Sequence, residues 1–203
     1  MKMISYLPFG LLACAMVGAC LQATATDNVC DTQPVSFPIP SLPSPPTNIG
    51  CESLPTVSLP PLTTTTSIDL SKDLGKVDDS GIVSKLTLAI TKLVIDNSQG
   101  DLDWVDSVDV QMATSNLPQV DLATYTMPRP PGAGVAKQLN VTVEAPAATV
   151  LQYLESGSVI LTITLTADTV SACTAQMLAT MGGTLNSNVE MCVSASVGFN
   201  KNL

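Results

Sequence analysis

Apolar and polar side chains alternate with a period of two along most of the chain after residue 67. Successive side chains of a β-strand point to opposite faces, so each such run predicts a half-buried strand. Five runs carry the pattern, and their apolar faces consist of Leu86, Leu88 and Ile90; Val108, Val110 and Met112; Leu139, Val141 and Val143; Val159, Leu161, Ile163 and Leu165; and Val189, Met191, Val193, Ala195, Val197 and Phe199. The parity of the first run changes before Leu93 and Ile95, which predicts a β-bulge near Thr91 and Lys92.

One stretch follows a helical pattern instead. Pro146 suits the first turn of a helix, and Val150, Leu151 and Leu154 fall on one face of it. Residues 171–180 fit either a short helix or a loop. Glycine, proline and asparagine signals separate the strands. Together these features predict an all-β fold, an antiparallel Ig-like β-sandwich with one short helix.

The chain before this region is rich in proline. Nine prolines fall in residues 31–66, and the segment ends in four consecutive threonines. Such a segment favours an extended polyproline conformation and is unsuited to the centre of a sheet. We expect a stalk at residues 26–66 that carries a β-sandwich domain at 67–203, rather than a PxxP ligand for a recognition module. The aliphatic side chains of Val35, Phe37 and Ile39 also allow a short edge strand on the domain.

The first 25 residues are typical of an export signal. Met1 and Lys2 precede an uncharged apolar run, and Ala23 and Ala25 have the spacing that a signal peptidase accepts. Val17-Gly18-Ala19-Cys20 fits a bacterial lipobox, in which Cys20 takes the lipid; the segment ending at Cys14 fits less well. A retained membrane anchor is the third interpretation, because the run is long enough to span a bilayer. We expect an exported lipoprotein facing the periplasm or outer membrane, or alternatively a secreted protein.

Composition and charge limit the classes of molecule that this protein is expected to bind. Hydrophobic residues make up 45% of the chain and charged residues 12%, and the formal net charge is −9. Nucleic acids and anionic membrane surfaces attract basic faces, so this composition argues against both as partners. The membrane is therefore expected to be contacted through the lipid anchor only. Another envelope protein or a polysaccharide is the expected partner.

The cysteine pattern predicts disulfides. Six cysteines occur, and Cys30, Cys51, Cys173 and Cys192 remain whichever signal cleavage is used. An even number in an exported chain is typical of a disulfide framework. Cys30–Cys51 and Cys173–Cys192 are the preferred pairs because each closes a short loop, and alternation places Cys192 on the polar face of its strand. A zinc site is the alternative, but the cysteines lack CxxC spacing and the chain has no histidine to complete it.

Candidate chemistry is confined to carboxylates. Without histidine there is no histidine general base or Ser-His-Asp triad, and no phosphate-binding glycine motif is present. Four aspartates surround Trp104, which is expected to anchor an aliphatic core: Asp101, Asp103, Asp106 and Asp109. Loop carboxylates could bind Ca²⁺, although the spacing departs from the EF-hand pattern. A glycosidase acid/base pair is a second interpretation. A solvated acidic turn is a third and the preferred one, so no cofactor is expected.

Two segments resemble known proteins. Residues 84–112, centred on Leu102-Asp103-Trp104-Val105-Asp106, and residues 150–158, which lead into a Thr-rich strand, are similar to predicted envelope lipoproteins of myxobacteria and related bacteria. They also resemble, more loosely, the Ig-like sandwich of late-embryogenesis and water-stress domains. The resemblance covers about two-thirds of the chain, and it implies an envelope sandwich without established catalytic residues.

Taken together, these patterns favour a non-catalytic binding or structural module of the cell envelope on a Pro-rich tether. A carrier of an apolar ligand is a second hypothesis, because a Thr/Val/Leu sandwich could open to hold a lipid, and an internal cavity would distinguish it. A hydrolase that uses the carboxylates of residues 96–109 is a third hypothesis.

Overall fold

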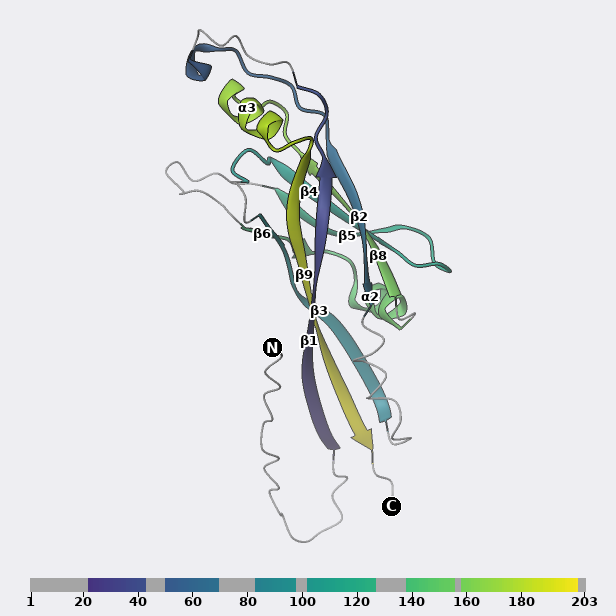
Figure 1. Ribbon diagram of the computed structural model, residues 1–203. Coiled ribbons are helices and arrows are strands. Elements are labelled where there is room, and N and C mark those ends of the chain that lie inside the picture. The colour runs from purple at the N-terminus through teal and green to yellow at the C-terminus, as the bar shows by residue number, and fades with distance from the viewer. Residues whose placement is uncertain are drawn as a thin grey trace.

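A computed structural model describes residues 22–42, 50–69, 83–97, 102–126, 138–155 and 158–200. The described chain is an antiparallel β-sandwich with two short helices (Figure 1). The first sheet has the order β1-β9-β3-β6. Its strands are β1 (Gln22–Pro38), β9 (Thr184–Asn200), β3 (Val83–Asp96) and β6 (Gln138–Asn140). The predicted fold class is therefore confirmed.

The second sheet has five strands in the order β2-β8-β4-β5-β7, with antiparallel neighbours throughout. Its strands are β2 (Leu62–Asp69), β8 (Ser158–Thr166), β4 (Ser107–Ala113), β5 (Val120–Thr126) and β7 (Thr142–Val143). The predicted alternation decides which side faces the first sheet. In β8 the four expected apolar side chains are buried, namely Val159, Leu161, Ile163 and Leu165.

The core lies between the two sheets and is mainly aliphatic. Phe37, Trp104 and Tyr153 are its buried aromatic members, with 0%, 5% and 3% of their surfaces exposed. Leu93, Ile95 and Met191 complete the first sheet's inner face. Trp104 is thus a core anchor, as the sequence predicts.

Two predicted irregularities in the strands have different outcomes. The register between β3 and β9 shifts between Ile90 and Lys92, which confirms the predicted bulge. The run 138–144 was expected to be one strand, but it forms two. β6 pairs with β3 in the first sheet, and β7 pairs with β5 in the second. The segment crosses between sheets at Val141, whose N–H donates to Leu93 O at 2.9 Å, because alternation sets the face of a strand but not its partner.

Both helices follow from local signals. The predicted helix is present as α2 (Ala147–Leu154), with Pro146 at its N-cap rather than in its first turn. It buries Val150, Tyr153 and Leu154, whereas Leu151, predicted on the same face, is half-buried. The undecided segment 171–180 forms a helix, α3 (Ala172–Thr180). Ser171 supplies its N-cap, because its Oγ accepts the Thr174 N–H at 3.1 Å and so satisfies a donor with no intrahelical partner.

The described parts of the expected stalk are instead part of the sandwich. β1 pairs with β9 along its whole length, and Val35, Phe37 and Ile39 are buried. β2, which contains the four threonines, pairs with β8. Residues 26–38 and 62–66 therefore belong to strands of the sandwich rather than to a separate stalk, and the edge-strand alternative for Val35, Phe37 and Ile39 describes β1. Proline is tolerated here because an edge strand leaves half of its N–H groups outside the ladder.

The long strands give the molecule its shape. In Figure 1, β1, β3 and β9 continue past the second sheet toward the C-terminus. The short 3-10 helix η1 (Cys51–Ser53) and α3 lie at the opposite end. No described helix is long and apolar enough to cross a membrane.

Candidate functional site

The four cysteines form two disulfides, but the pairs are not the expected ones. Cys30 is bonded to Cys192, and their Cα atoms are 4.0 Å apart. Cys51 is bonded to Cys173, with a Cα–Cα distance of 4.9 Å. The local pairs Cys30–Cys51 and Cys173–Cys192 are therefore wrong.

Strand register explains the first pair. Cys30 in β1 lies directly opposite Cys192 in β9, because the two ends of the domain pair antiparallel over 17 positions. Both side chains leave the sheet on the side away from the core, since Val29 and Val193, one position along, pack toward it. Cys192 is on the polar face as predicted, yet it is only 6% exposed.

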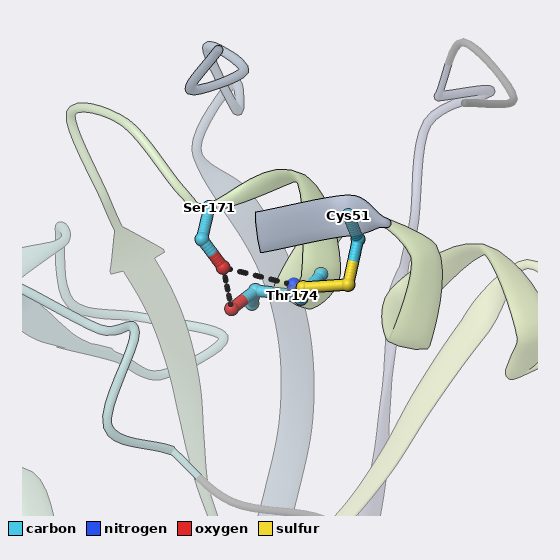
Figure 2. Close-up of a disulfide and its surroundings, with 4 residues drawn as sticks. Cys51, Ser171 and Thr174 are labelled. Carbon is cyan, nitrogen blue, oxygen red and sulfur yellow. Dashed lines mark hydrogen bonds between the residues drawn. A yellow bond between two sulfur atoms is a disulfide. The ribbon is translucent and has the colours of Figure 1, made fainter. Parts of the chain in front are cut away.

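The second disulfide joins two connections at one end of the sandwich (Figure 2). Cys51 belongs to η1, in the connection between β1 and β2, and Cys173 is the second residue of α3. A pocket of about 350 Å³ adjoins it, lined by Asp103, Trp104, Thr169, Val170, Ser171, Cys173, Thr174 and Met177. Close to the disulfide, the hydroxyl oxygens of Ser171 and Thr174 are 2.9 Å apart.

Of the four aspartates predicted as a possible calcium site, the three that the structure describes do not share one location. Asp101 lies outside the described residues, and Asp103 lines the pocket beside Trp104. Asp106 accepts the backbone N–H of Asp168 at 3.0 Å and so fixes the turn after β8. Asp109 is exposed on the outer face of the second sheet. The three described aspartates therefore have three separate surroundings.

Metal-ligating geometry occurs once among the described residues. Cys30, Glu190 and Cys192 place their ligand atoms within 4.8 Å of one another. Both sulfurs belong to the disulfide, however, and metals bind the thiolate rather than a disulfide sulfur. This arrangement therefore does not fit a metal ion.

The outer face of the second sheet carries an ordered polar surface, which the sequence analysis did not single out. One row across it consists of Thr63, Thr164, Asp109 and Thr124, which are paired in register through β2, β8, β4 and β5. The hydroxyl oxygens of Thr63 and Thr164 are 3.1 Å apart. Neighbouring strands lie about 4.8 Å apart, so the row spaces its polar groups regularly.

Carboxylates lie at the far side of this face. Gln111 Nε2 donates to Asp121 Oδ1 at 2.8 Å, and Thr124 Oγ1 donates to Glu144 Oε1 at 2.6 Å. A groove of about 340 Å³ lies there, lined by Asp109, Val110, Gln111, Asp121, Ala123, Thr124, Glu144 and Thr164. A β5 bulge opposite Val110 and Gln111 places both Asp121 and Thr124 on the outer side. We call the outward-facing polar side chains of this row and groove, which are exposed or half-buried, the hydroxyl–carboxylate face.

Alternation contained the signal for this face. The outward positions of β8 after Ser158 are Ile160, Thr162, Thr164 and Thr166, of which Ile160 alone is apolar, and β4 has Asp109 and Gln111 between its buried residues. In the sequence alone, these positions identify only which side of each strand faces the core. The registers between strands, which place them side by side, required the structure.

Two further predictions from the sequence concern the lipid-modified cysteine of the signal and the carboxylates of a hydrolase. Cys14, Cys20 and most of the signal lie outside the described residues. Asp96 and Asp109, at the ends of the predicted hydrolase cluster, belong to different sheets.

Comparisons with known proteins leave the family open. No protein-family model matches the sequence, and no significant match is found among curated proteins or solved structures. Inferences about function therefore depend on the chain's own residues.

Proposed function

We propose that this protein is an exported, lipid-anchored and non-catalytic binding module of a bacterial cell envelope. Its contact surface is the hydroxyl–carboxylate face. The single observation that supports the proposal is this face: outward-facing polar groups from four adjacent strands, in register, with two of its carboxylates held by hydrogen bonds.

Charge indicates the class of partner. Asp109, Asp121 and Glu144 line the groove, and the five strands of this sheet contain no lysine or arginine. Such a face attracts basic groups and repels anionic polymers. Sugar rings are commonly held against aromatic faces, and none of the described residues that line the groove is aromatic. The proposed partner is therefore an envelope protein that presents lysine or arginine.

The export part of the proposal rests on the sequence of residues 1–25 and agrees with the two disulfides, because disulfides persist in oxidising compartments. Mass spectrometry of the mature protein from membranes tests it. The expected N-terminus is a lipid-modified Cys20. An unmodified N-terminus at Thr26 would contradict the anchor.

Site-specific photo-crosslinking in intact cells tests the contact surface. A photoreactive amino acid replaces Thr164, on the hydroxyl–carboxylate face, or Thr32, which is exposed on the first sheet as a matched control. Crosslinked protein is expected from position 164 and not from position 32. Crosslinking from position 32 alone, or from neither position, would contradict the proposed surface.

A charge-removal variant tests the proposed electrostatics. Asp109→Asn, Asp121→Asn and Glu144→Gln together are expected to reduce crosslinking at position 164 by roughly tenfold, since each exposed charge contributes modestly and three act together. The control variant removes three exposed acids from other surfaces, through Glu52→Gln, Glu155→Gln and Asp168→Asn. Equal losses in both variants would show that net charge, rather than this face, governs binding.

A further inference from the structure

The two disulfides have different surroundings. Cys51 and Cys173 are both half-buried, and Cys173 lies on the wall of the 350 Å³ pocket. Cys30–Cys192 bridges two paired strands, with Cys30 exposed and Cys192 buried, so the contrast between the two bonds lies in the charges around them rather than in their exposure. The Glu190 Oε1 atom lies 3.7 Å from the Cys192 Sγ atom. A thiolate that attacks the Cys30–Cys192 bond therefore approaches a carboxylate.

Helix α3 favours one direction of bond cleavage at Cys51–Cys173. Thiol–disulfide exchange places negative charge on the sulfur that leaves. Cys173 lies in the first turn of the nine-residue helix α3, where the helix dipole and the N–H groups stabilise negative charge. The Ser171 and Thr174 hydroxyls lie on the same pocket wall. Asp103 on that wall opposes the effect and is half-buried, as Glu190 is. The contrast between the two bonds therefore depends on the helix N-terminus at Cys173 and on the 3.7 Å separation between Glu190 Oε1 and Cys192 Sγ.

We propose that Cys51–Cys173 is a thiol-exchange site, which a dithiol reductant opens while Cys30–Cys192 stays closed. A thiolate of the reductant attacks Cys51 Sγ, the Cys51–Cys173 bond breaks, and Cys173 Sγ leaves as a thiolate. The reductant's second thiolate then attacks its own sulfur in the mixed disulfide and releases Cys51. Two electrons pass to the cysteine pair, and the reductant, oxidised to its disulfide, supplies the two protons that the cysteines take up.

Opening this bond releases a limited part of the chain. The connection between β1 and β2 is also held by Val57 and Val170, whose backbone N–H groups each donate to the other's oxygen at 2.8 Å, and by buried Leu59. Reduction is thus expected to free η1 from α3 while both sheets persist. The pocket wall changes with it, and Trp104, the one tryptophan in the chain, lines that pocket.

The test uses the oxidised full-length protein in native buffer. Glutathione, a monothiol, is added, samples are alkylated at intervals, and cysteine-containing peptides are mapped by mass spectrometry. The Cys51–Cys173 bond is expected to open roughly tenfold faster than Cys30–Cys192. Glutathione is expected on Cys51 and the alkylating group on Cys173. Trp104 fluorescence should change at the same rate as this bond opens, without loss of the far-ultraviolet circular dichroism of the sheets.

Three results would overturn the proposal. They are faster opening of Cys30–Cys192, opening of both bonds together at the rate of global unfolding, and attachment of glutathione to Cys173 instead of Cys51. The Glu190→Gln variant serves as the control for charge. It is expected to speed opening of Cys30–Cys192 severalfold and to leave the rate at Cys51–Cys173 unchanged. Equal acceleration of both bonds would show that their separate surroundings do not set the rates.

Discussion

Selective removal of disulfides gives a stability test of the nested pairing. Cys30→Ser with Cys192→Ser removes one bond in this structure, whereas Cys30→Ser with Cys51→Ser removes both. With the local pairs Cys30–Cys51 and Cys173–Cys192, the first variant would remove both bonds and the second only one. The two variants therefore reverse their order of stability between the two pairings.

The expected size follows from loop closure. The bonds span 162 and 122 residues, and the shorter loop lies inside the longer one. With Cys51–Cys173 intact, Cys30 reaches Cys192 through a ring of about 40 residues, so its bond contributes about 4 kcal/mol to the free energy of unfolding. Once Cys30–Cys192 has been removed, Cys51–Cys173 closes its full loop of 122 residues and contributes about 5 kcal/mol to the free energy of unfolding. Losing both bonds then costs about 9 kcal/mol, which is most of the stability of a typical domain.

Urea denaturation followed by circular dichroism measures both variants. Free cysteines are alkylated first, so that Cys173 and Cys192 cannot form a new bond in the second variant. The Cys30/Cys192 variant is expected to fold with a lower midpoint, and the Cys30/Cys51 variant to be largely unfolded in buffer. The opposite order would refute the pairing. A loss below about 1 kcal/mol in both would refute the loop-closure reasoning itself.

Three single substitutions, measured by urea denaturation, test other parts of the fold. Ser187→Ala is expected to stabilise the protein by about 1 kcal/mol, because Ser187 Oγ is buried without a hydrogen-bond partner among the described residues; destabilisation would mean that the hydroxyl is satisfied. Phe37→Ala should cost about 3–5 kcal/mol, since the side chain is fully buried, whereas a stalk residue would cost almost nothing. Gly183→Ala should cost about 1 kcal/mol because its φ of 86° disfavours a Cβ atom, and Thr184→Ala at the neighbouring exposed position is the control.

Alternation predicted most of the strands because it reports directly on burial. It identified the inner faces of β8 and β4, and in β9 it identified the buried residues Val189, Met191 and Val193. The change of parity before Leu93 predicted the bulge. It could not give strand partners, since many pairings satisfy the same alternation. For that reason the split of residues 138–144 between two sheets was missed, and so was the hydroxyl–carboxylate face, which exists only once β8, β4 and β5 lie side by side.

The proline-rich segment was expected to be a stalk, but part of it forms an edge strand of the sandwich. Proline is unsuited to central strands, but β1 and β2 are edge strands in their sheets. Proline content alone therefore could not distinguish a stalk from an edge. Val35 and Phe37, at alternate positions, carried the opposing signal, and burial of an aromatic and an aliphatic side chain outweighs the missing N–H groups.

The disulfide pairing depends on the same long-range register as the core. Val35 and Phe37 must face inward in β1, and Val189, Met191 and Val193 must face inward in β9. The intervening positions then face outward, and Cys30 and Cys192 both belong to that outward set. A slip of one residue would turn the buried side chains to solvent and separate the two cysteines at once. Short sequence separation has no part in this choice, because the two ends of the domain meet in one antiparallel pair. Once Cys30 and Cys192 are joined, Cys51 and Cys173 are left on connections at the same end of the sandwich, so the second bond follows from the first.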